Sequence, residues 1–194
     1  MNDTINYYNK NAEQYYKNTV DVDFTDAYER FLKYIPKGGR IIDVGCGSGR
    51  DTAAFKEMGY DAIGLDASEE LAEVARKGKG IDVIVEDMAS WITDEPYDGI
   101  WSCASLLHLD NKELISFFQN LNRNLKVEGA IYISVKTAIE TGVDNKGRFM
   151  KNFTEEELRG YLDLAGIEIV ETWDTGDQLN REGFSWINVI GIKR

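Results

Sequence analysis

Short apolar runs alternate with longer amphipathic stretches along this chain of 194 residues. The runs of strand length cover residues 40–44, 61–65, 81–85, 99–103, 130–136, 167–173 and 186–192. The stretches of helical period cover residues 4–18, 24–35, 51–58, 68–77, 112–125 and 154–166. Strands that alternate with helices in this way predict an α/β fold around a mostly parallel sheet. The fifth run is almost entirely apolar, which is typical of a strand buried on both faces.

Local signals mark where several of these elements begin and end. The breaker Pro36-Lys37-Gly38-Gly39 ends the second helix, Ser68 is a favourable N-cap, and Thr154 opens a capping box. The last two strands are joined by an acidic loop, so we expect an antiparallel pair at the sheet edge. Residues 137–152 are polar and have no clear period. No repeat or linker divides the chain, which predicts a single domain over residues 1–194.

The strongest chemical signal is the glycine-rich turn after the first strand, Gly45-Cys46-Gly47-Ser48-Gly49. Glycines let the backbone turn sharply and approach a ligand, and the following helix N-terminus offers unpaired N–H groups. Dinucleotide sites use GxGxxG, but here Arg50 occupies the third glycine position. With Asp43 ahead of it, the turn fits the zwitterionic methionine end of S-adenosylmethionine (SAM) better than a diphosphate.

Two further acidic residues end the second and third strands. Asp66 is placed to accept both ribose hydroxyls of a nucleoside, and Asp87 to accept the exocyclic amine of adenine, with Met88 beside the ring. Each has a simpler interpretation: Asp66 can favour the dipole of the next helix, and Asp87 can be a turn residue. Because strand carboxyl ends line one crevice in such sheets, their coincidence with the glycine turn favours a nucleoside cofactor.

Composition and charge limit the kinds of molecule that the chain is expected to bind. The chain is 43% hydrophobic and 29% charged, which is globular composition, and its formal net charge is -12. A strongly acidic domain repels nucleic acid, since such binding depends on Lys and Arg at phosphates. Two cysteines and one histidine argue against a disulfide framework or a metal site. No apolar run approaches the roughly 18 residues of a membrane span, and the start lacks a secretory signal, so we expect a cytoplasmic protein with no membrane partner.

The chain resembles the class I SAM-dependent methyltransferases, in particular the small bacterial single-domain type similar to tellurite-resistance methyltransferases. The resemblance runs from about Tyr7 to the C-terminus. It rests on the segments 41–51, 64–68, 86–88 and 97–101, which read IIDVGCGSGRD, GLDAS, EDM and YDGIW. These motifs are specific for the superfamily and do not specify a substrate.

The resemblance implies a Rossmann-like seven-stranded sheet in the order 3-2-1-4-5-7-6, with strand 7 antiparallel and helices on both faces. Residues 1–35 would form an N-terminal helical cap, and residues 137–152 a segment on the substrate side. The cofactor residues that the resemblance implies are Tyr7, Tyr15, Asp43, Gly45, Gly47, Gly49, Asp66, Ala67, Asp87, Met88, Cys103 and Ala104. The two tyrosines would cover the cofactor, although they fit a core-facing stripe equally well.

Candidate acceptor-side residues follow the fourth and fifth strands. His108, with an ordinary pKa of about 6.5, can take a proton from the acceptor; a loop histidine with no catalytic duty is the alternative. Lys136 and Arg148 can face an anionic acceptor, although solvated loop cations need no such role. Trp173, Asp177 and Trp186 flank the last hairpin, where the tryptophans form an aromatic wall or pack the sheet edge.

These observations predict methyl transfer from SAM to an oxygen, nitrogen, sulfur or chalcogen nucleophile of a small molecule, by a monomer or homodimer. Cys103 lacks a preceding proline, and the fourth strand lacks the Asn/Asp-Pro-Pro-aromatic motif, so nucleic-acid bases are disfavoured as acceptors. The alternatives are an NAD-dependent oxidoreductase, which Arg50 argues against, and a non-catalytic SAM-binding module. Methylation of a protein or of RNA ranks lower.

Overall fold

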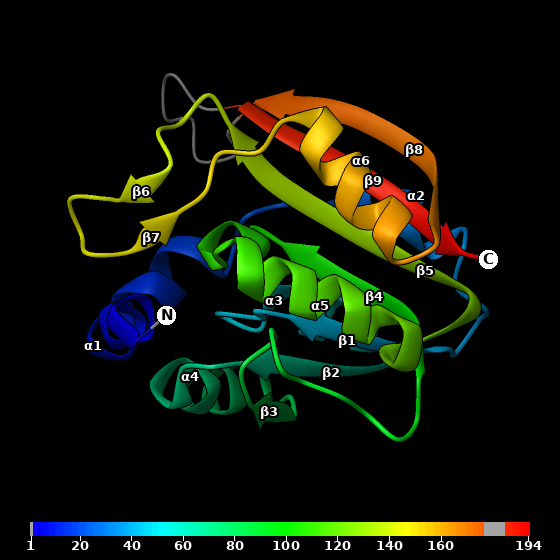
Figure 1. Cartoon of the computed structure of the whole chain (residues 1–194). Helices are drawn as coiled ribbons and strands as arrows, with labels where there is room; N and C mark the ends of the chain where they lie inside the picture. Colours follow the sequence, from blue (N-terminus) through cyan, green and yellow to red (C-terminus); the bar gives the residue numbers. More distant parts are fainter. Residues whose placement is uncertain (1, 177–184) are drawn as a thin grey trace.

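The computed structural model describes residues 2–176 and 185–194, and it is built on one seven-stranded sheet (Figure 1). Its strands are β1 (Arg40–Val44), β2 (Asp61–Asp66), β3 (Val83–Val85), β4 (Tyr97–Cys103), β5 (Leu125–Thr137), β8 (Ile167–Gly176) and β9 (Ser185–Lys193). The spatial order is β3-β2-β1-β4-β5-β9-β8. The first five strands pair in parallel, whereas β9 is antiparallel to both β5 and β8. The predicted order and the antiparallel last strand are confirmed. Asp177 lies outside the described residues.

Helices cover both faces of this sheet. They are α1 (Asn2–Thr19), α2 (Thr25–Leu32), α3 (Arg50–Glu57), α4 (Glu69–Lys79), α5 (Asn111–Asn124) and α6 (Glu155–Leu164), with a single 3₁₀ turn, η1 (Leu106–His108). On one face, α5 and α6 bury Phe117, Phe118 and Leu158 against the central strands. On the other face, α2 and α3 bury Phe31 and Phe55 around the fully buried Trp101.

The predicted element boundaries are largely confirmed, with local differences. The Ser68 side chain accepts a hydrogen bond from Leu71 N–H at the start of α4, and Thr154 opens a capping box at α6. The second helix is shorter than predicted. Its last predicted residues form a turn instead, in which the N–H groups of Tyr34 and Ile35 donate to carbonyls three residues earlier in the chain. The segment 137–152 contains a hairpin of β6 (Gly142–Val143) and β7 (Phe149–Met150). Strands of two residues are too short to leave a period in the sequence.

Helix α1 lies across the carboxyl ends of the strands, beside α4 and the β6–β7 hairpin (Figure 1). It is kinked at Asn11, whose φ of -120° and ψ of 16° are not helical. Hydrogen bonds to other elements hold its first half: among them, Asn9 Oδ1 accepts from Ser68 Oγ at 2.6 Å, and Thr4 Oγ1 accepts from Phe149 N–H at 3.0 Å. The chain's first helix is therefore fixed above the edge where the candidate site residues end their strands.

Candidate functional site

The glycine-rich turn is held against the end of β2. The N–H groups of Gly45 and Cys46 donate to the Leu65 carbonyl at 2.7 and 3.0 Å. The carboxylate of Asp66 accepts from Gly47 N–H through one oxygen and from Ser68 N–H through the other, both at 2.9 Å. Burial raises the pKa of Asp66, and these two backbone hydrogen bonds oppose the rise. The carboxylate that sequence analysis assigned to ribose thus also fixes the turn beside it.

Each glycine of the turn has positive φ and a close neighbour. The φ values of Gly45, Gly47 and Gly49 are 74°, 53° and 72°, a region that disfavours side chains. A Cβ atom on Gly45 would lie 2.3 Å from the Ser105 Cβ, and one on Gly47 would lie 2.9 Å from a ring carbon of Tyr15. A Cβ on Gly49 would meet the Ile81 side chain at 2.5 Å. Gly45 and Gly47 therefore shape the floor of a site, whereas Gly49 allows α3 to pack closely on its neighbours.

Asp43 faces the first turn of α3. Its Oδ2 accepts from the N–H and the hydroxyl of Thr52 at 3.1 and 2.8 Å. Burial, reinforced by the nearby Asp51 carboxylate, raises its pKa well above the ordinary value. This carboxylate holds helix α3 to the end of β1, and it does not line either of the cavities described below.

A buried cluster under the site was not anticipated from the sequence. Asp51 accepts a hydrogen bond from Trp101 Nε1 at 2.8 Å, another from the Tyr28 hydroxyl, and one from Arg50 Nη2 at 2.8 Å. The guanidinium of Arg50 lies 4.1 Å from the ring centre of Phe24, and its Nη1 donates to the Thr19 carbonyl at 3.3 Å. Arg50 is thereby fixed with one side facing a cavity, in the position where a dinucleotide site has glycine.

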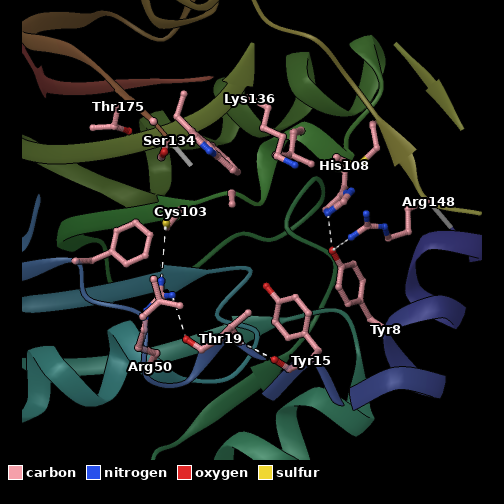
Figure 2. A pocket seen from close by; sticks show the side chains of 17 residues that line it. Tyr8, Tyr15, Thr19, Arg50, Cys103, His108, Ser134, Lys136, Arg148 and Thr175 are labelled. Carbon is pink, nitrogen blue, oxygen red and sulfur yellow. Dashed lines mark hydrogen bonds between the residues drawn. The ribbon is translucent and has the colours of Figure 1, made fainter. Parts of the chain in front are cut away.

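Two adjoining cavities lie between helix α1 and the strand ends. The smaller, of about 60 Å³, has the glycine turn and Asp66 in its wall, and we call it the cofactor cavity. The larger, of about 140 Å³, lies toward β5 and β9, and we call it the acceptor cavity (Figure 2). Four residues line both: Tyr8, Tyr15, Ala104 and His108. These four form the partition at which a group in one cavity can meet a group in the other.

Most of the predicted site residues line one of these cavities. The cofactor cavity gathers Tyr15, Gly45, Gly47, Asp66, Ala67, Met88 and Ala104. The acceptor cavity gathers Tyr15, Cys103, Ala104, His108, Lys136 and Arg148. Four predicted residues line neither: Tyr7, Asp43, Gly49 and Asp87. The Asp87 carboxylate accepts from Ala89 N–H at 2.9 Å, as the turn interpretation expects.

Tyr8, which the sequence analysis did not single out, lines both cavities, whereas Tyr7 lines neither. Tyr8 and Tyr15 are seven residues, about two helical turns, apart, so they share one face of α1, with ring centres 5.2 Å apart. The buried residues Thr4 and Ala12 lie on the same face of the helix. That spacing was a usable signal for Tyr8, and it was missed.

His108 is held at both ring nitrogens. Its Nδ1 lies 2.8 Å from the Phe149 carbonyl, its Nε2 lies 2.8 Å from the Tyr8 hydroxyl, and Arg148 Nη1 donates to that hydroxyl at 3.2 Å (Figure 2). Burial lowers the pKa of His108 to about 4; the Phe149 hydrogen bond and Asp144 oppose this, and Arg148 and Lys136 add to it. The imidazole is therefore neutral at neutral pH.

The cations that line the acceptor cavity come from separate elements. Arg148 follows β6 and pairs with Asp144 at 2.7 Å, and Lys136 ends β5 with its ammonium 5.3 Å from the ring centre of Trp186. Lys136 is only 7% exposed. Sequence analysis proposed both as acceptor-side residues, and the fold brings them to one cavity.

Within the described part of the chain, no helix is long and apolar enough to cross a membrane. The same residues contain no group of three or more His, Cys, Asp or Glu side chains arranged to hold a metal ion.

A family model described as a methyltransferase domain matches residues 15–172. The protein YqeM of Bacillus subtilis, named as a methyltransferase, is 31% identical over 125 residues, which are 58% of this chain and 50% of that protein. Trans-aconitate 2-methyltransferase of Rhizobium rhizogenes is 34% identical over 99 residues, 50% of this chain and 38% of the relative. An 18S rRNA (guanine-N(7))-methyltransferase of Schizosaccharomyces pombe is 30% identical over 141 residues, 64% of this chain and 53% of the relative. The chain thus spans about half the length, or less, of these curated relatives.

Solved structures share the fold. A 1,6-didemethyltoxoflavin-N1-methyltransferase of Burkholderia thailandensis, crystallised with bound 1,6-didemethyltoxoflavin and S-adenosylhomocysteine, superposes with a TM-score of 0.75 at 21% identity, covering 97% of this chain and 88% of that one. A TehB-like SAM-dependent methyltransferase of Corynebacterium glutamicum gives a TM-score of 0.72 at 17% identity, covering 96% and 98%. At these identities the similarity is one of fold.

Proposed function

The chain belongs to the class I SAM-dependent methyltransferases, and from this premise we propose that it transfers a methyl group from SAM to a small molecule, leaving S-adenosylhomocysteine. The observation that carries the proposal is the contact between the glycine turn and the Asp66 carboxylate, since both belong to one cavity wall. SAM supplies an electrophilic methyl group when it is bound. The remaining chemistry falls to the side chains around the two cavities.

The residues of the cofactor cavity fit the proposed ligand. Gly45 and Gly47 have no Cβ, so Ser105 and Tyr15 pack directly against the turn, which presents backbone to the methionyl part once the Tyr15 ring moves. Asp66, next to Ala67, offers carboxylate oxygens of the kind that ribose hydroxyls require, and Met88 offers an apolar surface for a base. Tyr15 contacts Gly47, so we expect its ring to move aside when the cofactor binds.

The shape of the acceptor cavity supports a small molecule. Its wall combines apolar and aromatic side chains with a few polar groups, which is typical of small-ligand sites. It adjoins the cofactor cavity across Tyr8, Tyr15, Ala104 and His108, and α1 covers the junction, so an acceptor placed there is held and shielded from water. The net charge of -12 disfavours RNA, although one relative is named for an rRNA reaction.

Calorimetry tests this proposal against its rivals. We expect S-adenosylhomocysteine to bind the protein and NAD to give no heat, because Arg50 stands where the dinucleotide turn has its third glycine. Absence of heat with S-adenosylhomocysteine from folded protein would overturn the proposal. Incubation with labelled SAM and either a metabolite extract or total RNA then separates the acceptor classes. Label in RNA alone would overturn the small-molecule part, and binding without transfer to either would leave a non-catalytic module.

A further inference from the structure

The hydrogen bonds around His108 run in one direction, which the chemistry of each group fixes. The Phe149 carbonyl can only accept, so His108 Nδ1 must carry a hydrogen. In the neutral ring Nε2 is then an acceptor, and the Tyr8 hydroxyl 2.8 Å away must donate to it. Arg148 has only donors, so its 3.2 Å contact with the same hydroxyl is accepted by the tyrosine oxygen.

The Tyr8 oxygen has one acceptor position left. A phenol oxygen has two lone pairs, and Arg148 uses one of them. Among the described residues no side chain or backbone group donates to the second. Tyr8 lines both cavities, which makes a group bound at their junction the candidate donor to this lone pair. His108 Nε2, by contrast, is already occupied by Tyr8.

We propose that the acceptor carries a hydroxyl group, which donates its proton to Tyr8 while Tyr8 passes its own proton to His108 Nε2. This inference rests on the proposed methyltransferase function and names the nucleophile of that site. As the acceptor oxygen forms its bond to the methyl carbon, the carbon–sulfur bond breaks and its electron pair stays on sulfur. The products are the methyl ether, S-adenosylhomocysteine and a protonated His108, which returns its proton to solvent.

The choice of a hydroxyl over other nucleophiles follows from the presence of the Tyr8–His108 relay beside both cavities, because a hydroxyl must lose its proton as its oxygen is alkylated. An alcohol or phenol becomes strongly acidic as its oxygen is alkylated, so a weak base can take its proton during the transfer. Burial makes His108 such a weak base, with a pKa of about 4. A neutral amine can attack the methyl carbon through its lone pair with no base, and a thiol can ionise before it binds, so neither needs this relay during the transfer.

Tyr8 and His108, joined by the hydrogen bond at Nε2, form a dyad. It can be observed without an acceptor, because His108 is the chain's single histidine. Nitrogen-15 labelling of histidine then gives one pair of ring signals. With S-adenosylhomocysteine bound, we expect a protonated Nδ1 and a hydrogen-bonded Nε2. The Nε2 signal should shift in Tyr8→Phe and stay unchanged in the control Tyr16→Phe, whose ring packs on Gly78 outside both cavities. A protonated Nε2, or identical spectra for wild type and Tyr8→Phe, would overturn the dyad.

The nucleophile is tested with SAM labelled at its methyl carbon and a metabolite extract, because the carbon-13 shift separates O-methyl from N- and S-methyl groups. We expect an O-methyl product, formed about 100-fold or more slowly by Tyr8→Phe and at the wild-type rate by Tyr16→Phe, with S-adenosylhomocysteine affinity retained. An N- or S-methyl product, or unchanged turnover in Tyr8→Phe, would overturn this inference and leave the proposed function standing. Failure to bind S-adenosylhomocysteine, or binding with no labelled product, would remove the proposed function and this inference with it.

Discussion

The two cavities differ in how the chain builds them. The wall of the cofactor cavity comes mainly from turns that directly follow neighbouring parallel strands, and its key contact joins Gly47 to Asp66, nineteen residues away. The wall of the acceptor cavity comes from helix α1, the β6–β7 hairpin and the last strands, and its key contact joins Tyr8 to His108, one hundred residues away. The cofactor cavity is therefore shaped mainly by backbone geometry, and the acceptor cavity by side chains on separate elements.

This difference predicts which side of the site tolerates substitution. A turn that must be left-handed at three positions tolerates little change, whereas a side-chain network on a hairpin and a covering helix can be replaced piece by piece. Substitutions on the cofactor side should therefore damage folding and binding together. Substitutions on the acceptor side should leave the fold largely intact.

The largest effect is expected from Gly45→Ala. A Cβ there is strained by its φ of 74° and would lie 2.3 Å from the Ser105 Cβ, so we expect about 3–5 kcal/mol of lost stability and no S-adenosylhomocysteine binding. Gly59→Ala is the matched control, since φ is 89° and nothing lies within 4 Å of its Cβ. It should lose about 1–2 kcal/mol. Urea unfolding measures both, and equal losses would contradict the close packing of the turn.

Asp66→Asn tests the carboxylate itself. The amide keeps one acceptor for the backbone of the turn but loses the charge, so we expect S-adenosylhomocysteine affinity to fall about 100-fold, or about 2.7 kcal/mol. Asp61→Asn is the control, because Asp61 is an exposed carboxylate at the opposite end of β2. Calorimetry measures the affinity of both variants for S-adenosylhomocysteine. An affinity of Asp66→Asn within a few-fold of wild type would show that the ribose does not bind to Asp66.

His108 should make stability depend on pH. Its pKa is depressed to about 4 in the folded state, against about 6.5 when unfolded, so its contribution is present above pH 6.5 and is lost as the pH falls toward 4. Between pH 7 and pH 5 the free energy of unfolding of the wild type should fall by about 2 kcal/mol more than that of His108→Gln. Urea titrations at both pH values measure this difference. Parallel pH curves for the two proteins would show that His108 is solvated.

The smallest effect is expected where α1 meets α4. A Cβ on Gly78 would lie 2.4 Å from the Tyr16 hydroxyl, which is the far end of a flexible side chain, so Gly78→Ala should change stability by less than about 1 kcal/mol. The helix above it should nevertheless open more often. Amide exchange in residues 12–19 is expected to become faster, with exchange in α5 unchanged as the internal reference.

The sequence was sufficient for the sheet order, and it predicted that Gly45, Gly47 and Asp66 lie together, because those signals are local. These residues stand at or just after strand ends, and parallel strands bring such residues to one edge. Tyr8 was missed because neighbouring residues on a helix differ by about 100° in direction, and only the partner surface shows which one faces inward. The contact of Asp43 with Thr52 was not predicted, because it needs the fold to be seen, and its cofactor role stays a prediction. The Tyr8–His108–Arg148 arrangement joins three distant segments, and no spacing rule predicts it.

Ser68 connects the ligand carboxylate to the covering helix. Its N–H donates to Asp66, its hydroxyl oxygen caps α4 by accepting from Leu71 N–H, and its hydroxyl hydrogen reaches Asn9 in α1. A nucleoside that binds to Asp66 therefore contacts a carboxylate that is hydrogen-bonded to Ser68, the residue that also holds α1 through Asn9. We therefore expect ligand binding at Asp66 and the position of α1 to be coupled through Ser68.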